Sequence, residues 1–179
     1  MVTNIVEAIQ QKLGYRPLKK VDPNTQEIKE ANKMSAEEKL PQAAIPAVLA
    51  AMIKYSDSQD GINLLTASDD KTWLGTIYGG QQDNAIKKVA DYAGVDAGEA
   101  RRHMENISKA AVEIAKEVVK TPDAEKLRSF MNSQRHSILS HLPAAMKLGD
   151  VLNEETFDDR TNKMEGPVSS LLHRIEDIL

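Results

Sequence analysis

Apolar side chains return at the spacing of an α-helix along most of this chain, and this periodicity restricts the possible folds more than any other feature. Residues 97–119 give the clearest case, because their apolar positions follow one another at alternating steps of four and three: Ala100, Met104, Ile107, Ala111, Ile114 and Val118. Such steps place side chains on one face of a helix. Strict alternation of apolar and polar residues, which is typical of strands, is hard to find. The sequence therefore predicts an all-α fold.

The sequence also carries signals for where helices begin and end. Asn4 and Ser35 are each followed three residues later by glutamate, which is the pattern of an N-terminal capping box. Gly14 and Gly94 follow periodic segments, and glycine commonly ends a helix because it adopts the left-handed conformation without strain. These signals predict a multihelical bundle of about seven to nine helices in one domain that spans residues 1–179.

Three stretches depart from regular helix. Residues 15–34 are polar and contain turn signals, so we expect an irregular arm. Residues 153–166 are acidic and predict a loop-rich segment. Pro41 and Pro46 interrupt the helical region 35–55, and each predicts a kink or a restart because proline has no backbone N–H to donate.

Composition excludes several functional classes. The chain has 23 basic and 27 acidic side chains, a net charge of -4 and no cysteine. A disulfide framework, a thiolate metal site and a cysteine nucleophile are therefore excluded, and the acidic balance argues against a protein that coats nucleic acid. The longest nearly apolar run, Ala43–Ile53, is 11 residues, well below the ~18 needed to cross a bilayer. With no signal-peptide pattern at the N-terminus, we expect a cytoplasmic protein with no membrane partner.

One segment resembles a helix-turn-helix. In residues 86–106, Ala90 lies four residues before Gly94 with apolar residues around the turn, as in the bihelical unit of bacterial repressors. This interpretation makes the protein a DNA-binding or regulatory protein, with four candidate nucleic-acid contacts: Lys87, Lys88, Arg101 and Arg102.

Other features of the same segment argue for two packed core helices instead. Its four basic residues are balanced by four acidic ones, so it has no net attraction for phosphate. Asp96 and Glu99 lie at the start of the second helix, where they would face the DNA backbone, and His103 occupies a position that is normally apolar in repressors.

No motif assigns catalytic, cofactor-binding or metal-ligating residues. None of the four histidines follows a glutamate by three positions, and no His-Glu-x-x-His is present, so we expect no metal site. Neither a Gly-x-Ser-x-Gly nor a phosphate-binding loop occurs, and we expect no cofactor. An enzyme with an unfamiliar pocket around Arg135, His136 and Asp150 stays open as a third class.

Two packing expectations follow from the pattern. Trp73, the single tryptophan, lies beside apolar residues and is expected in the core. Ile107, Ala111 and Ile114 are expected to pack within the same chain, against helices at 122–141 and 167–178, because short connections favour neighbours in sequence.

Three runs within residues 40–119 together resemble the YidB-like family of bacterial proteins. The runs are IPAVLAAMIKYSDSQDGINLL, WLGTIYGG and AIKKVADYAGVDAGEARRHMENISKAAVEI. The resemblance implies an all-helical fold and carries over no catalytic residues. From the sequence as a whole we expect a non-enzymatic interaction module whose partner is another protein or a second copy of this chain, with DNA binding as the alternative.

Overall fold

The computed structural model describes residues 3–68 and 72–154, and within them it confirms the all-α fold. Eight α-helices and three short 3-10 helices account for the regular structure of these residues, and the one β-bridge between Val21 and Ile28 is isolated. The α-helices are α1 (Ile5–Leu13), α2 (Ala36–Asp57), α3 (Asn63–Thr66), α4 (Trp73–Tyr78), α5 (Gln82–Ala93), α6 (Ala97–Val119), α7 (Ala124–Leu139) and α8 (Leu148–Leu152).

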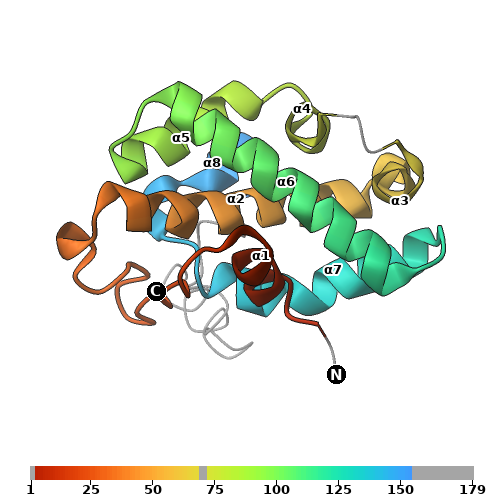
Figure 1. The fold of residues 1–179 in the computed structure, drawn as a ribbon, viewed down its shortest axis with the longest axis horizontal. Helices are drawn as coiled ribbons and strands as arrows, with labels where there is room; N and C mark the ends of the chain where they lie inside the picture. The colour runs from red at the N-terminus through yellow and green to blue at the C-terminus, as the bar shows by residue number, and fades with distance from the viewer. Residues whose placement is uncertain (1–2, 69–71, 155–179) are drawn as a thin grey trace, which may run out of the picture.

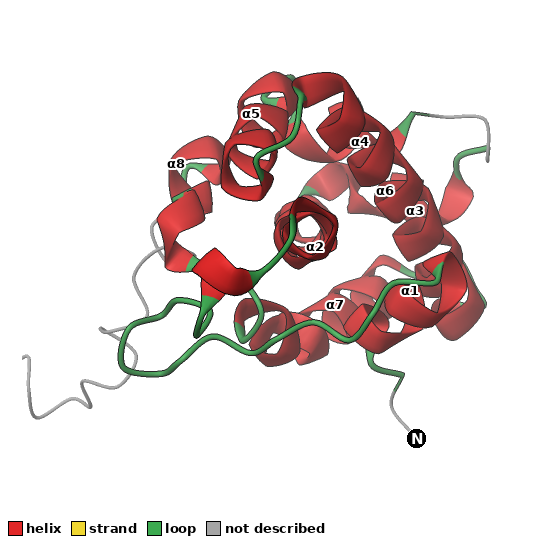
Figure 2. Ribbon diagram, turned by 60° about the vertical axis from the view of Figure 1, so that its left-hand side comes forward, coloured by secondary structure: helices red, strands yellow, loops and turns green. Residues whose placement is uncertain are grey.

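Helix α2 runs through the centre of the molecule, and the other helices surround it (Figure 2). Every residue from Leu40 to Ile53 is buried, so no face of this stretch reaches solvent. Many of these residues are alanines, and their small side chains allow the surrounding helices to approach the α2 backbone closely. A helix that is apolar on all sides is stable only inside such a shell.

Of the two alternatives predicted at Pro41 and Pro46, a restart of the helix is wrong, because α2 continues through both prolines. A kink stays a prediction. Each proline removes one backbone hydrogen bond. Packing on every side of α2 compensates for this loss, since most helical stability in a protein comes from tertiary contacts. The predicted start of α2 is confirmed: the Ser35 hydroxyl accepts from the Glu38 N–H, and the Glu38 carboxylate accepts from the Ser35 N–H.

Helix α6 crosses α2 along most of its length (Figure 1). The predicted burial of Ile107, Ala111 and Ile114 in the core of the chain is confirmed, with exposures of 0%, 0% and 5%. The prediction that these residues pack against the helices at 122–141 and 167–178 is wrong in part. Helix α6 packs mainly on α2, α1 and α5 and only slightly on α7, because the central α2 separates α6 from most of α7. The predicted helix at 167–178 lies outside the described residues.

The buried face of α6 is wider than the predicted stripe. It also includes Ser108, Ala110, Val112 and Ala115, as expected for a helix that touches several neighbours. At its C-terminal end Val118 is 36% exposed, and Val119 is buried instead. The buried side at this end of α6 carries Val112, Ala115 and Val119, which follow one another at steps of three and four. Trp73 is buried in α4, as predicted.

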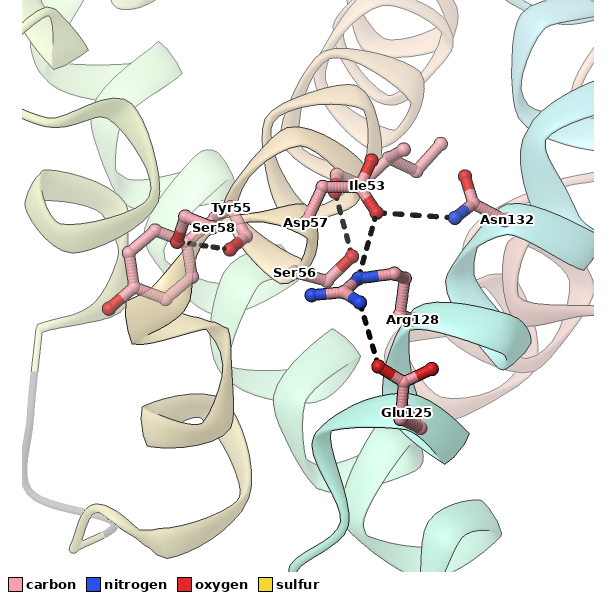
Figure 3. A network of polar contacts seen from close by, with 8 residues as sticks. All are labelled: Ile53, Tyr55, Ser56, Asp57, Ser58, Glu125, Arg128 and Asn132. Atoms are coloured by element: carbon pink, nitrogen blue, oxygen red, sulfur yellow. Dashed lines mark hydrogen bonds and ion pairs between the residues drawn. The ribbon is translucent and has the colours of Figure 1, made fainter.

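Polar contacts join the end of α2 to the beginning of α7 (Figure 3). The Asp57 carboxylate accepts a hydrogen bond from the Asn132 amide and lies 3.5 Å from Nε of Arg128. Arg128 also pairs with Glu125 at 2.9 Å. These groups are largely exposed, so they orient α7 on α2 without adding much stability.

The arm, residues 15–34, wraps the N-terminal end of α2 on the side of the α7–α8 connection (Figure 1). It is tied there by backbone contacts, including Val21 N–H to Ser140 O at 2.8 Å and Ala144 N–H to Gln26 O at 3.1 Å. Ile28 and Met34 are its buried anchors. The predicted loop at 153–166 lies almost wholly outside the described residues. Among helices of residues 3–68 and 72–154, none is long and apolar enough to span a membrane.

Candidate functional site

A pocket of about 600 Å³ opens where the arm meets the N-terminal ends of α2 and α6. We call it the arm pocket. Its lining combines aliphatic side chains, two prolines and charged groups. The lining residues are Leu13, Gly14, Tyr15, Arg16, Pro17, Leu18, Lys19 and Met34 from the end of α1 and the arm, Ser35, Glu37, Glu38, Leu40, Pro41 and Gln42 from the N-cap and start of α2, and Glu99 and His103 from α6. A volume of this size matches that of pockets for small ligands or a few side chains.

Gln42 fixes the arm against α2. Its side chain is 1% exposed and makes three hydrogen bonds. Oε1 accepts from the Lys19 N–H at 2.8 Å, and Nε2 donates to the Lys19 carbonyl at 3.0 Å and to the His141 carbonyl at 2.9 Å. Because the amide binds both backbone groups of Lys19, this stretch of the arm has one defined position over α2.

Tyr15 and His103 connect the arm to α6 at the opposite side of the pocket. The Tyr15 hydroxyl lies 2.7 Å from Nδ1 of His103, and the two rings are tilted with centroids 6.0 Å apart. Burial raises the pKa of Tyr15, so the phenol keeps its proton near neutral pH and can act as the donor in this contact.

Of the three glutamates that line the pocket, only Glu38 has a side chain that forms hydrogen bonds or ion pairs with described residues. Hydrogen bonds from the Ser35 backbone and hydroxyl, together with the nearby Lys19 and Arg16, hold the pKa of Glu38 below its usual value. The Arg16 guanidinium is 3.9 Å from the Glu38 carboxylate. The carboxylates of Glu37 and Glu99 have no hydrogen bond or ion pair with any residue that the structure describes.

These groups suit binding better than catalysis. Because its pKa is raised, Tyr15 stays protonated near neutral pH, so little phenolate is present to act as a base or a nucleophile. Aliphatic walls and unpaired carboxylates instead offer hydrophobic contact and charge recognition. Within the described ranges no three histidine, aspartate or glutamate side chains gather as metal ligands would.

The four predicted nucleic-acid contacts lie around the turn between α5 and α6, where Gly94 has a φ of 71°. Three of them face carboxylates: Lys87 pairs with Asp91 at 2.6 Å, Arg101 with Asp83 at 2.6 Å, and Lys88 with Asp150 at 3.8 Å. Arg102 is exposed. A phosphate would have to compete with these carboxylates, and a gel shift with random duplex at several salt concentrations tests the DNA-binding prediction.

The residues of the predicted enzymatic pocket have other neighbours. Arg135 pairs with Glu154 at 3.0 Å, and Asp150 lies near Lys88. His136 is exposed on α7. An enzyme with a pocket around these three residues therefore stays a prediction, and the contacts of Arg135 and Asp150 do not support it.

The arm pocket was missed in the sequence because its parts are far apart along the chain. Tyr15 and His103 are 88 positions apart, and no local pattern links them. Two signals were present. Gln42 is the one amide in the stretch Leu40–Ile53, which the structure buries completely, and a buried amide requires hydrogen-bond partners. His103 interrupts the apolar pattern expected at its position because it contacts Tyr15.

No protein-family model, curated protein or solved structure matches this chain. The resemblance to the YidB-like family therefore stays a prediction, and the function has to be judged from the geometry of the site.

Proposed function

We propose that this protein is a non-enzymatic interaction module that binds a short segment of a partner protein in the arm pocket. The observation that carries the proposal is the pocket itself, a concavity of about 600 Å³ with aliphatic walls. The rest of the described surface offers little alternative, because Val118 is the one large apolar side chain exposed on it. Within the pocket, the partly exposed side chains of Leu13 and Leu18 give a partner apolar surface to contact.

The backbone of the arm favours a peptide as the occupant. The N–H groups of Arg16 and Leu18, which border the pocket, have no hydrogen-bond acceptor in residues 3–68 and 72–154. On α2, Pro41 has no N–H, so the Glu37 carbonyl lacks the donor it would find four residues later in a regular helix. A peptide carries amides that can pair with both kinds of group.

The architecture of the pocket supports recognition without chemistry. Gln42 and the Tyr15–His103 contact fix the arm before a ligand arrives, and a preformed site loses less entropy on binding. The resemblance to the YidB-like family, which assigns no catalytic residues, agrees with this proposal. We also propose that the protein acts in the cytoplasm, which cell fractionation tests.

Selection from a phage-displayed library of random seven-residue peptides tests the proposed function. Enriched clones are compared on the wild-type protein and on two tryptophan variants of α6. Glu99→Trp places a bulky side chain in the pocket and removes one negative charge. Glu105→Trp is the control, because it makes the same change at a half-buried position of α6 outside the pocket.

We expect enriched clones to bind the wild type and Glu105→Trp equally and to lose binding to Glu99→Trp. Equal binding to all three proteins would place the binding surface elsewhere and overturn the proposal, and so would a selection that enriches no sequence. Circular dichroism of both variants confirms that each is folded before the comparison is made.

A further inference from the structure

The arm is attached to the rest of the molecule along one edge of its backbone. Gln42 binds both the N–H and the carbonyl of Lys19, and the Val21 N–H donates to the Ser140 carbonyl at 2.8 Å. In an extended chain the N–H and carbonyl of one residue point to the same side, and successive residues alternate between two edges. These contacts therefore indicate an extended conformation, with Lys19 and Val21 on the edge that faces the core.

The opposite edge of the same stretch is open beside the arm pocket. Arg16 and Leu18 alternate with the attached residues, and Arg16 is restricted to extended backbone because Pro17 follows it. The N–H and carbonyl of both residues have no hydrogen-bond partner within residues 3–68 and 72–154, and both residues line the pocket. This edge therefore offers two donors and two acceptors at the border of the pocket.

Further along the arm, the same edge is already paired with another part of the chain. The Asp22 N–H donates to the Glu27 carbonyl at 2.8 Å, and Val21 and Ile28 form an antiparallel bridge. That bridge is isolated, and the returning chain turns away at Glu30, whose φ of 57° is left-handed, into a 3-10 helix. The pairing therefore ends before it reaches the part of the edge that borders the pocket.

We infer that the partner segment binds as an extended strand whose backbone pairs with Arg16 and Leu18 along the open edge of the arm. This inference rests on the proposed function, since it names the conformation of the segment that the arm pocket binds. A helical segment would use its backbone groups internally and leave those of the arm unpaired. An extended segment pairs with them and directs alternate side chains to the protein. Leu18 is half-buried, so an aliphatic residue opposite it forms a cross-strand pair.

Backbone methylation of the bound peptide tests this geometry. The probe is the tightest-binding seven-residue peptide from the phage selection, prepared as a series in which each member carries one backbone N-methyl group. The methyl group removes one donor and blocks that edge of the peptide, so only positions whose N–H faces the arm should be sensitive. Isothermal titration calorimetry with the wild-type protein measures the dissociation constant of each member.

Two variants of Leu18 provide the matching test on the protein. Leu18→Ala and Leu18→Pro both lose the leucine side chain, but only the proline lacks the backbone N–H. That N–H has no acceptor among the described residues, so its removal breaks no hydrogen bond of the fold. Circular dichroism confirms that both variants are folded, and slow hydrogen exchange at the Lys19 amide confirms that the arm keeps its position.

We expect an alternating pattern along the peptide. N-methylation at every second position within the paired stretch should weaken binding about tenfold, as the loss of one backbone hydrogen bond does, and the positions between should change little. Leu18→Pro should likewise bind the unmodified peptide about tenfold more weakly than Leu18→Ala. Losses without alternation, or equal binding by the two variants, would overturn the inference and leave the proposed function standing.

Two further outcomes would also overturn the inference. If light scattering shows a wild-type dimer that Leu18→Pro converts to a monomer, the open edge belongs to a second copy of this chain. If the selection enriches no peptide, the inference and the proposed function fail together.

Discussion

The hydroxyl of Tyr15 lies 2.7 Å from Nδ1 of His103, and this contact joins the beginning of the arm to α6. It forms one end of the arm pocket, and Gln42, which binds Lys19, forms the other. Between these two contacts the arm passes over the N-terminal end of α2. These two polar contacts therefore add to the buried anchors Ile28 and Met34 in fixing the arm that forms the pocket.

Tyr15→Phe should loosen the arm at a modest cost in stability. The variant loses one hydrogen bond, so we expect the free energy of unfolding to fall by about 1 kcal/mol. Urea denaturation followed by the fluorescence of the buried Trp73 measures this change. Tyr55→Phe is the matched control, because the Tyr55 hydroxyl has no hydrogen-bond partner among residues 3–68 and 72–154 (Figure 3), and it should stay within about 0.5 kcal/mol of wild type. Equal effects of the two substitutions would contradict the role given to Tyr15.

Gln42→Leu should free the arm from α2. It keeps a side chain of similar size but leaves the Lys19 backbone groups and the His141 carbonyl without their partner. We expect a loss of roughly 2–3 kcal/mol in unfolding free energy and faster hydrogen exchange at the Lys19 amide. Gln10→Leu is the control, because Gln10 is a buried glutamine of α1 whose side chain makes no hydrogen bond to the arm, while its carbonyl, which accepts from the Tyr15 N–H, is kept in the variant. Unchanged exchange at Lys19 in Gln42→Leu would show that other contacts hold the arm.

The positions of most helices could be predicted from the sequence, but the way the helices pack together could not. Capping at Asn4 and Ser35 and the stops at Gly14 and Gly94 depend on local backbone chemistry, so they could be predicted. The continuity of α2 through Pro46 depends on burial by helices that follow much later in the chain. The Tyr15–His103 contact is of the same kind, since only tertiary packing brings the arm to α6.

Two aspartate substitutions four residues apart on α6 test the assignment of its buried face. Ile114→Asp places an unpaired carboxylate in the core, which costs several kcal/mol, so the variant should be unfolded by circular dichroism. Val118→Asp adds the same charge at a position that is 36% exposed, and it should stay folded within about 1 kcal/mol of wild type. A folded Ile114→Asp of smaller size by light scattering would instead identify this face as an oligomer interface.

Alkaline pH should destabilise the fold through the buried Tyr78 and the partly buried Tyr92. Burial, with a smaller contribution from the nearby Glu27, raises the pKa of Tyr92 from 10.0 to about 12, and burial also raises the pKa of Tyr78, which donates to the Ala47 carbonyl. The folded state therefore keeps protons that the unfolded state releases, and this stability is complete below pH 10 and is lost as pH rises towards 12. Urea titrations at about pH 9 and about pH 11 measure the loss.

Tyr92→Phe is the control for this pH dependence. It removes one titrating group and leaves the alkaline titration of lysines unchanged, so its stability should decline less than that of wild type over the same interval. If the two proteins lose stability equally, Tyr92 does not contribute to the alkaline transition.

A crystal structure of the protein with the tightest-binding selected peptide is the most direct test of the arm pocket as the binding site. We expect the peptide between the arm and the N-terminal end of α2, in contact with residues that line the arm pocket. A peptide bound on another face, such as the α5–α6 turn that carries Lys87 and Arg101, with the arm pocket unoccupied, would contradict the account.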